Sequence, residues 1–466
     1  MNKKIALLIL FCSLLLGCSL APKYKRPEMV VPEKFPVSAN PDSTTKQEID
    51  LSQIKWQDFF KDEKLKQVIT IALENNRDLK VAALNVEKLQ ALYRIQRSQL
   101  FPSIDASGSS HKEKIPPAVS GLPQSYIQEL YSAGVGVTGW EFDLFGRINS
   151  LRKSALLRYL ASAEGYRSAR TTLIAQTALI YCALAADKEN LSLANKTLET
   201  RKKSLELIEE RYKNGLASEI ALNQARYAYE LSRGESLRLE TTVSQDINAL
   251  NLITGASIPE ELLPEDLESV QMPDDFIPNL SSAVLLNRPD ILQAENQLKA
   301  ANADIGAARA SFFPFIGITT SLGSASSDLK GLFDSGSGKW LFASQINLPL
   351  FDFGSRWNRL KASKVDKKIA VAQYEKAIQT AFREVSDALA VKERIDQQLD
   401  SSSKLVLASE ETLRLSNIRY ENGIDNYLTV LDSERSLYAS KQQEIAVRLV
   451  KISNLVTLYK ALGGGA

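Results

Sequence analysis

Few residues in the sequence have types that could perform chemistry, and their spacing argues for simpler roles. His111 is the single histidine, so a catalytic triad or a histidine-based metal site would have only one imidazole to use. We interpret it as a solvated residue of a polar loop. Residues 134–139 match G-x-G-x-x-G, but these glycines alternate within a strand-like run that continues into Trp140. A dinucleotide loop would instead open a helix, which argues against that site.

Two carboxylates, Glu141 and Asp143, are the remaining catalytic candidates, as the acid and base of a hydrolase. They lie where a strand-like run passes into a helical one, and Asp352 occupies the matching place later in the chain. A structural role in a turn accounts for both positions. The sequence therefore predicts no enzyme activity, no metal site and no cofactor.

The N-terminus has the pattern of a lipoprotein signal. Lysines near the start are followed by an apolar run from Ile5 to Leu16, which is too short to span a bilayer. The run ends in Leu15-Leu16-Gly17-Cys18, which resembles the bacterial lipoprotein cleavage box. We expect residues 1–17 to be removed and Cys18 to carry lipid. Ser19 follows where an Asp would resemble an inner-membrane retention signal, so the outer membrane is favoured.

Composition excludes several further classes of protein. The chain has 466 residues, 44% of them hydrophobic, and 57 Lys plus Arg against 55 Asp plus Glu. This balance leaves no basic field for a nucleic-acid partner. With Cys12 removed and Cys18 lipidated, Cys182 is alone, and its apolar neighbours indicate a buried small residue instead of a reactive thiol.

Proline placement predicts long helices. No proline occurs in residues 124–258 or after Pro349. Within the first of these spans, apolar residues recur at spacings of three, four and seven, as in packed long helices. A helix over residues 149–213 would be about 100 Å long. Helices over 65–99 and 217–252 would each be about half that length, so two of them could stack end to end along the long one as one wall of a tube.

Landmarks recur in the same order in both halves of the chain, which indicates an internal duplication. Each half would contain a helix, strands, a long helix and a short helix. The matching segments are residues 97–102 and 309–314, 142–147 and 351–356, 211–215 and 419–423, and 250–255 and 458–463.

Alternating sequence occurs only between the first helix and the long helix of each repeat. The clearest runs are Tyr131–Thr138, Ile316–Gly323 and Trp340–Leu348, with a weaker one beginning at Ile104. Their length and single apolar face are typical of membrane strands. Four strands do not close a barrel, because about eight is the minimum. Either the sheet packs against another surface or several chains pool their strands.

The predicted domains follow from these boundaries. A lipid-anchored segment precedes the first repeat, and a linker separates the two repeats. The ranges are 1–17 for the signal peptide, 18–64 for the anchored segment, 65–255 for repeat 1 with strands in 103–142, 256–285 for the linker, and 286–466 for repeat 2 with helices over 286–311, 355–421 and 426–462 and strands in 314–349.

Several longer motifs, together with the lipoprotein box, resemble the outer-membrane efflux channels of the TolC superfamily, most closely its OprM-like lipoprotein branch. The motifs are residues 17–27, 74–79, 140–147, 287–291 and 458–464. The resemblance covers essentially the whole mature chain. It implies a mainly α protein with membrane β structure, in which three identical chains form one β-barrel continuous with an α-helical periplasmic tunnel.

The same resemblance implies a function and partners. The chain would be the outer-membrane channel of a tripartite efflux pump, working with a periplasmic adaptor and an inner-membrane transporter of the resistance-nodulation-division type. The alternative use is the exit duct of a type I protein secretion system. A lipid-anchored hydrolase and a passive helical scaffold are the competing classes, and the scaffold leaves the alternating strands unexplained. The sequence does not identify the cargo.

A gate is expected at the helix turns near residues 214–215 and 422–423. The segment 419–432 is similar to the family segment whose leucine and aspartate point into the pore, which places these roles on Leu428 and Asp432, one helical turn apart. Arg419 and Tyr420 would tie neighbouring helices together. The acid that holds them is left open between Asp425 and Glu421, and a plain turn with surface charges is the simpler alternative. A ring of carboxylates would favour cations. The loops over 110–124 and 324–338 are expected to face the cell exterior.

Overall fold

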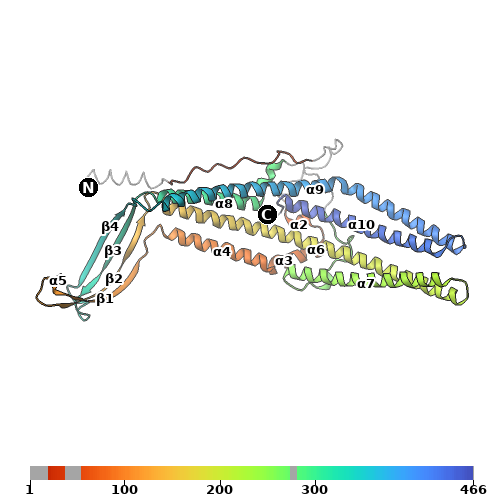
Figure 1. Cartoon of the computed structure of the whole chain (residues 1–466), viewed down its shortest axis with the longest axis horizontal. Helices are drawn as coiled ribbons and strands as arrows, with labels where there is room; N and C mark the ends of the chain where they lie inside the picture. Colours follow the sequence, from red (N-terminus) through yellow and green to blue (C-terminus); the bar gives the residue numbers. More distant parts are fainter. Residues whose placement is uncertain (1–18, 37–53, 273–280, 465–466) are drawn as a thin grey trace. The chain divides into compact units, whose positions relative to one another are not determined.

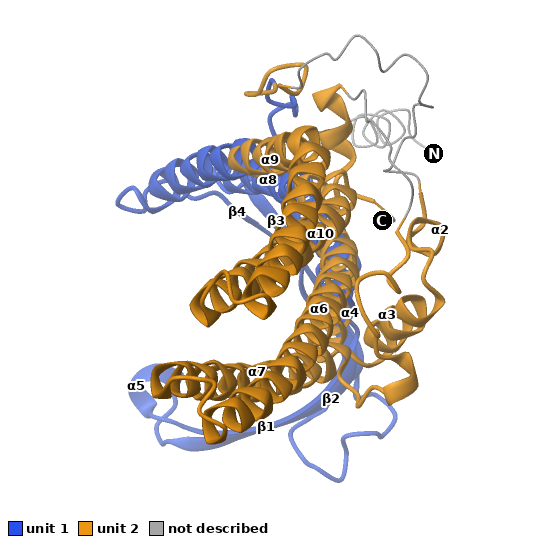
Figure 2. Cartoon of the chain, turned by 90° about the vertical axis from the view of Figure 1, so that its right-hand side faces the viewer, with its two compact units in different colours: residues 1–28, 85–163, 293–375 blue, residues 29–84, 164–292, 376–466 orange. Residues whose placement is uncertain are grey.

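The computed structural model describes residues 19–36, 54–272 and 281–464. Cys18 and the signal peptide expected before it lie outside these ranges. The chain divides into two compact units, coloured separately in Figure 2. The first unit comprises residues 1–28, 85–163 and 293–375, and the second comprises residues 29–84, 164–292 and 376–466.

The first unit contains an antiparallel sheet of four strands in the order β1-β2-β3-β4 (Figure 1). The glycines of the G-x-G-x-x-G match lie inside β2, where Gly134 pairs with Gly323 of β3. A Cβ atom at Gly136 would collide with the carbonyl oxygen of Thr320. These glycines therefore allow close approach of two strands. The strands are β1 (Asp105–Ile115), β2 (Tyr126–Phe142), β3 (Phe315–Ser326) and β4 (Gly338–Asn347).

The prediction for His111 was wrong, because this residue lies in β1 and not in a loop. It pairs with Leu130 of β2, and its Nε2 is 3.2 Å from Oε2 of Glu113. Beside it, Lys112 forms an ion pair with Glu129 across the two strands. The start of this strand near Ile104 was predicted, but its continuation to Ile115 was assigned to the loop expected over residues 110–124. Its side chains are polar on both faces, so no apolar alternation marks it.

The helix expected over residues 65–99 is two helices, α3 and α4. Asn76 leaves the helical conformation, and its Oδ1 accepts a hydrogen bond from the backbone N–H of Leu79 at 2.8 Å. Its Nδ2 donates to the carbonyl of Ile253 at 2.8 Å. Asn76 therefore ends one helix and caps the next. These two helices are α3 (Glu63–Asn75) and α4 (Arg77–Ser98), and the others are α6 (Arg147–Lys213), α7 (Glu219–Thr254), α8 (Pro289–Ala310), α9 (Ser355–Glu421) and α10 (Tyr427–Ala461), with short helices α2 (Trp56–Phe59), α5 (Pro117–Ser120), η1 (Glu260–Leu262) and η2 (Ser282–Asn287).

An extended segment directly after Cys18 lies along α8 in the first unit. Glu295 of α8 is buried, and it accepts hydrogen bonds from Tyr24 at 2.9 Å and bidentately from Arg26 at 2.9 and 2.8 Å. Further along, Gly306 leaves no room for a side chain, since an added Cβ would lie 2.8 Å from the Cβ of Ala21. Residues 19–26 are therefore fixed to the helix, and we refer to them as the N-terminal strap.

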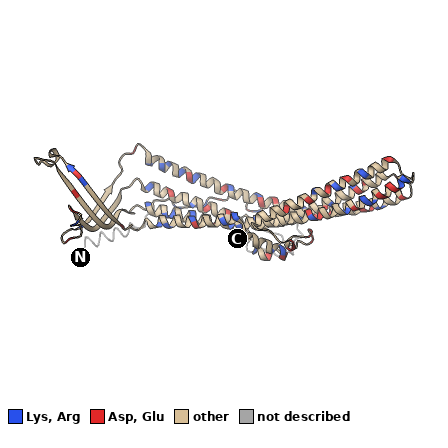
Figure 3. Cartoon of the chain, turned by 90° about the horizontal axis from the view of Figure 1, so that it is seen from below, with Lys and Arg blue, Asp and Glu red and all other residues tan. Residues whose placement is uncertain are grey.

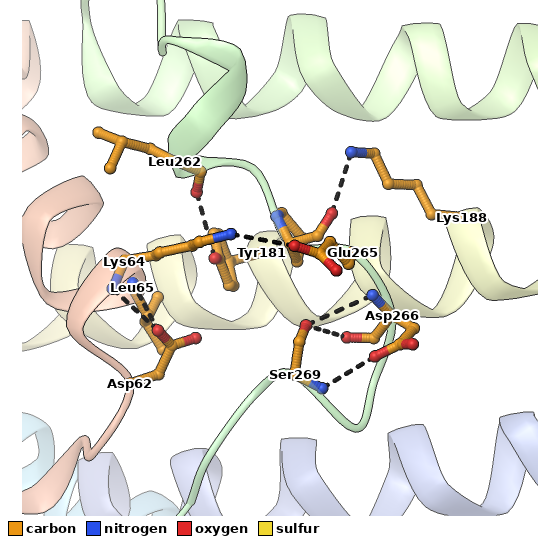
Figure 4. A network of polar contacts seen from close by, with 10 residues as sticks. Asp62, Lys64, Leu65, Tyr181, Lys188, Leu262, Glu265, Asp266 and Ser269 are labelled. Atoms are coloured by element: carbon orange, nitrogen blue, oxygen red, sulfur yellow. Dashed lines mark hydrogen bonds and ion pairs between the residues drawn. The ribbon is translucent and has the colours of Figure 1, made fainter.

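The second unit is held by a network between the segment after α7 and the helices α3 and α6 (Figure 4). Lys188 of α6 donates to the carbonyl of Pro264 at 2.9 Å, and burial lowers the pKa of this lysine. Tyr181 donates to the carbonyl of Leu262 at 3.2 Å. Cys182, beside Tyr181, is fully buried, and burial raises its thiol pKa to about 12. It is an unreactive core residue, as the sequence predicted.

Among the described helices, α6 alone is long and apolar enough to cross a membrane by length and composition. Most of its apolar window, 61%, is buried inside the structure. This is the behaviour of a core helix, because a lipid-facing helix would expose its apolar side chains.

Candidate functional site

Two helix turns, one in each repeat, have nearly the same backbone. In the first turn the N–H of Leu216 donates to the carbonyl of Arg211 at 2.8 Å, and in the second the N–H of Ile424 donates to that of Arg419 at 2.9 Å. Each turn passes through a glycine with positive φ, 73° at residue 215 and 69° at residue 423. The shared Arg-Tyr-x-Asn-Gly sequence explains the likeness, since glycine adopts this left-handed conformation without strain.

Arg419 closes the second turn through an ion pair. Its Nε and Nη2 donate to the two carboxylate oxygens of Asp425 at 2.6 and 3.0 Å. The hydrogen bond from Arg419 lowers the pKa of Asp425, so this carboxylate stays ionised. The structure therefore places Asp425, and not Glu421, against Arg419. The corresponding residue of the first turn is Ala217, which offers no carboxylate.

Tyr420 connects this turn to α6. Its hydroxyl oxygen lies 3.4 Å from Nη1 of Arg211, and the Arg211 guanidinium carbon is 5.6 Å from its ring centre. On the other side, its ring lies 5.5 Å from that of Tyr427 at the start of α10. Arg211, which has no carboxylate partner in the first turn, thus interacts with the aromatic ring of Tyr420 in the second turn.

Leu428 and Asp432 lie on the exposed face of α10. The Leu428 side chain is 44% exposed, whereas Val430 and Leu431 are buried. Asp432 is exposed and accepts a hydrogen bond from Arg435 at 2.9 Å. Both predicted pore residues therefore point away from the core of their own chain. The arginine offsets part of the negative charge that a carboxylate ring would carry.

A buried ion pair that was not predicted from the sequence links α6 and α10. Nε of Arg201 is 3.7 Å from Oε2 of Glu434, and their side chains are only 9% and 12% exposed. Nη1 of Arg201 also donates to the carbonyl of Ala228 at 3.1 Å and to Oγ of Ser232 at 2.8 Å. The two facing atoms of the ion pair have no hydrogen-bond partner. Both charges are thus buried, but no hydrogen bond joins them. This is an unfavourable arrangement for an ion pair, because the cost of desolvation is only partly offset.

The surroundings of Glu434 perturb its titration. Burial raises the pKa of its carboxyl group, and the charge of Arg201 opposes this shift. A spacing signal could have identified the arginine, because Ala194, Arg201 and Ile208 are seven residues apart and all three are buried. A charged residue at a core position of a heptad pattern is a candidate for a specific role.

An apolar cluster surrounds these polar contacts and joins the helices near both turns. It brings together side chains from α6, α7 and α10, so the helical hairpins of the two repeats share one core within the second unit. Its buried members are Ile208, Leu222, Ala225, Ala228, Tyr427, Val430 and Leu431.

The carboxylates considered for hydrolysis have structural roles in the first unit. Asp143 accepts hydrogen bonds from the backbone N–H groups of Ile148 and Asn149 at 3.1 and 2.8 Å, which caps α6. Glu141 binds Arg147 bidentately. Asp352 accepts hydrogen bonds from the backbone N–H groups of Gly354 at 3.2 Å and Arg356 at 2.9 Å, so it caps the start of α9. Among the described residues, no group of three or more His, Cys, Asp or Glu could hold a metal ion.

Comparisons with known proteins agree with this architecture. The family model described as outer membrane efflux protein matches residues 68–256 and 280–464, one segment in each repeat. The chain is 43% identical to the probable efflux pump outer membrane protein TtgC of Pseudomonas putida, covering 100% of this chain and 96% of that protein. It is 37% identical to the outer membrane protein OprJ of Pseudomonas aeruginosa, covering 98% and 95%.

Solved structures have the same fold. A membrane protein from Pseudomonas aeruginosa matches with a TM-score of 0.90 and 36% identity over 96% of this chain and 98% of that one. The open state of the MtrE outer membrane channel of Neisseria gonorrhoeae matches with a TM-score of 0.85 and 36% identity over 96% and 98%. This chain belongs to the outer membrane efflux protein family, the TolC-like channels of the outer membrane.

Proposed function

We propose that this chain is the outer-membrane exit channel of a tripartite efflux pump of the resistance-nodulation-division type. The observation that carries the proposal is the match of an efflux-channel family to both repeats, together with relatives named as efflux pump proteins. Other relatives are named as toluene and antibiotic efflux pump proteins, which favours small molecules over secreted proteins as cargo. A type I secretion duct is therefore the less supported use.

The open sheet supports assembly into a homotrimer. In the described part of the chain, β1 and β4 each pair with a neighbour on one side only. Unpaired backbone groups are costly in a membrane, so both edges need a partner strand. Trp340, Phe342 and Ile346 of β4 are also strongly exposed. Three chains with four strands each would exceed the minimum for a closed barrel and present such residues to lipid.

The remaining partners follow from the pump architecture. A periplasmic adaptor and an inner-membrane transporter would deliver the cargo, and the outer-membrane lipid would hold the chain through its barrel and through lipid on Cys18. Glu141 and Asp143 are occupied by Arg147 and the α6 N-terminus, which argues against the hydrolase alternative, and the proposed channel role needs no enzymatic activity and no cofactor.

The channel would be closed at the helix turns of the second unit. We assign the constriction to Leu428 and Asp432, whose side chains are not needed in the core of their own chain. Arg419 with Asp425, and Tyr420 with Arg211, would fix the positions of the turns. The buried pair of Arg201 and Glu434 would act as a latch between the two hairpins, because their mutual attraction is lost when the two charges separate.

Two experiments test these assignments separately. Deleting the gene should raise the accumulation of pump substrates in cells, and expressing the chain should restore efflux. If efflux is unaffected by deletion in a strain that lacks related channels, the assignment as an exit channel is wrong. Replacing Leu428 and Asp432 together with Ala should raise single-channel conductance in planar bilayers, whereas wild-type conductance in this variant would place the constriction elsewhere.

A further inference from the structure

The start of α9 carries an excess of positive charge. Residues 354–368 contain six Lys and Arg and one acid, Asp366. Charged residues are coloured along the chain in Figure 3. Arg356 donates to Asp352 at 2.9 Å, but the other five cations form no ion pair within the described residues. These five are Arg359, Lys361, Lys364, Lys367 and Lys368.

The corresponding start of α6 provides an internal comparison, because the two helices occupy matching places in the duplicated repeats. There, Arg147 is paired with Glu141, and Arg158 is paired with Asp304 of α8 at 2.8 Å. Arg152 and Lys153 of α6 form no ion pair within the described residues, so the first repeat pairs two of its four cations here and α9 pairs one of its six. Five cations of α9 are thus left available to an external partner.

Helix geometry places three of the lysines in line with a tryptophan. Lys361, Lys364 and Lys368 follow Trp357 by four, seven and eleven residues. At about 100° per residue, these four side chains fall within an arc of roughly 60°, with Asp366 on the opposite side. All four are exposed. We refer to these four residues as the α9 stripe.

Exposed aromatic residues lie directly before the stripe, between the end of β4 and the start of α9. Phe351 and Phe353 are 77% and 92% exposed, and their ring centres are 4.6 Å apart. Phe353 has a φ of 52°, which non-glycine residues rarely adopt. With Trp357 exposed at 67%, these rings have the character of the aromatic girdle that marks the rim of a membrane barrel.

We propose that the α9 stripe binds the headgroups of anionic phospholipids in the periplasm-facing leaflet of the outer membrane. The aromatic residues would mark the boundary of the hydrocarbon layer, and the lysines would follow at headgroup depth. Unpaired lysines beside a membrane surface attract anionic lipid, and the attraction decreases within a Debye length. Along the helix, Lys361, Lys364 and Lys368 lie about 6, 10 and 16 Å beyond Trp357. Their contributions should decrease in that order.

The proposal is tested with the full-length channel reconstituted in phosphatidylcholine vesicles that contain brominated lipid. Bromine quenches tryptophan fluorescence on contact, and the signal of Trp357 is obtained as the difference between wild type and Trp357→Phe. Brominated phosphatidylglycerol should associate with this site about fivefold or more tightly than brominated phosphatidylcholine, and high salt should reduce the preference.

Two triple variants distinguish the effect of lysine charge on lipid binding from an effect of altered folding. Replacing Lys361, Lys364 and Lys368 together with Gln should abolish the preference, whereas replacing all three with Arg should retain it. The matched control, in which Gln replaces Lys196, Lys202 and Lys203 of α6, removes the same charge in the second unit and should leave the preference unchanged. Equal quenching by both lipids in the wild type would overturn the proposal. Absence of any quenching of Trp357 would also overturn it, since the stripe would then face the channel interior or another subunit.

Discussion

The buried pair of Arg201 and Glu434 gives the sharpest test of the proposed latch between the two hairpins. The informative change is Glu434→Gln, which removes the charge and keeps the shape. At the 3.7 Å separation, the attraction is about 4 kcal/mol for an effective dielectric constant of about 20. The variant loses this attraction but no longer has to desolvate a carboxylate, which costs several kcal/mol.

The net effect of Glu434→Gln on the ratio of closed to open channels should be modest, and it should favour the open channel. Arg201 keeps its hydrogen bonds to Ala228 and Ser232 in the variant, so the closed arrangement should lose about 1–2 kcal/mol, or roughly 5–30-fold in the ratio of closed to open channels. Arg201→Met should have the larger effect, about 3–5 kcal/mol, because it leaves the Glu434 carboxylate buried without a counter-charge.

The assay is the open fraction of single channels in planar bilayers, with entry of a large antibiotic into cells as a second readout. The matched control is Arg435→Gln, which removes the neighbouring surface pair with Asp432 and should change the ratio by less than about 1 kcal/mol. The expected order of opening is Arg201→Met, then Glu434→Gln, then Arg435→Gln. If Glu434→Gln opens no more often than Arg435→Gln, the latch assignment is wrong.

Three further predictions concern stability, topology and the N-terminal strap. Burial and the neighbouring Asp187 raise the pKa of Asp246 to about 6, so the folded state binds this proton more tightly than the unfolded state and stability falls as the pH rises between about 4 and 6. Asp246→Asn should therefore raise the free energy of unfolding at pH 7 by about 1–2 kcal/mol, a value reduced to allow for screening of this group by solvent. Urea titrations below about pH 4 should show no such gain. Cysteines at Val119 and Leu329, which are exposed beside the strands, should react with an impermeant thiol reagent on intact cells, and protection of both with labelling at Asn214 would invert the topology. Gly306→Val should displace the strap from α8 because of the contact with Ala21, and unchanged resistance of the strap to proteolysis would contradict this.

Much of the fold could be predicted because its signals are repeated along the chain. The proline-free spans and the recurring motifs indicate a duplicated, mainly helical protein with a small sheet, and the structure and comparisons confirm that class. Asn76 was missed because asparagine is tolerated within helices, and only its tertiary bond to Ile253 makes it a break. Only the start of β1 was predicted, because polar side chains on both of its faces leave no alternation to mark its second half.

The candidate site was predictable only in part, for a physical reason. The turns could be located because glycine and the residues around it determine the local backbone. The choice of Asp425 as the partner of Arg419 depends on how the turn folds back, which spacing alone left open. The partner of Arg201 lies far away in the sequence, on α10, so only the packing of two hairpins reveals that pair.

The two long helices have the same length, and this restricts how the gene can change. Both α6 and α9 contain 67 residues. Deleting one residue from either would shorten it by about 1.5 Å and rotate everything beyond the deletion by about 100°. Every later side chain would then leave the position where its neighbours pack. Insertions and deletions should therefore be tolerated only when they add or remove nearly whole helical turns and occur in both repeats. The two halves of the gene can then diverge in sequence, but their lengths must change together.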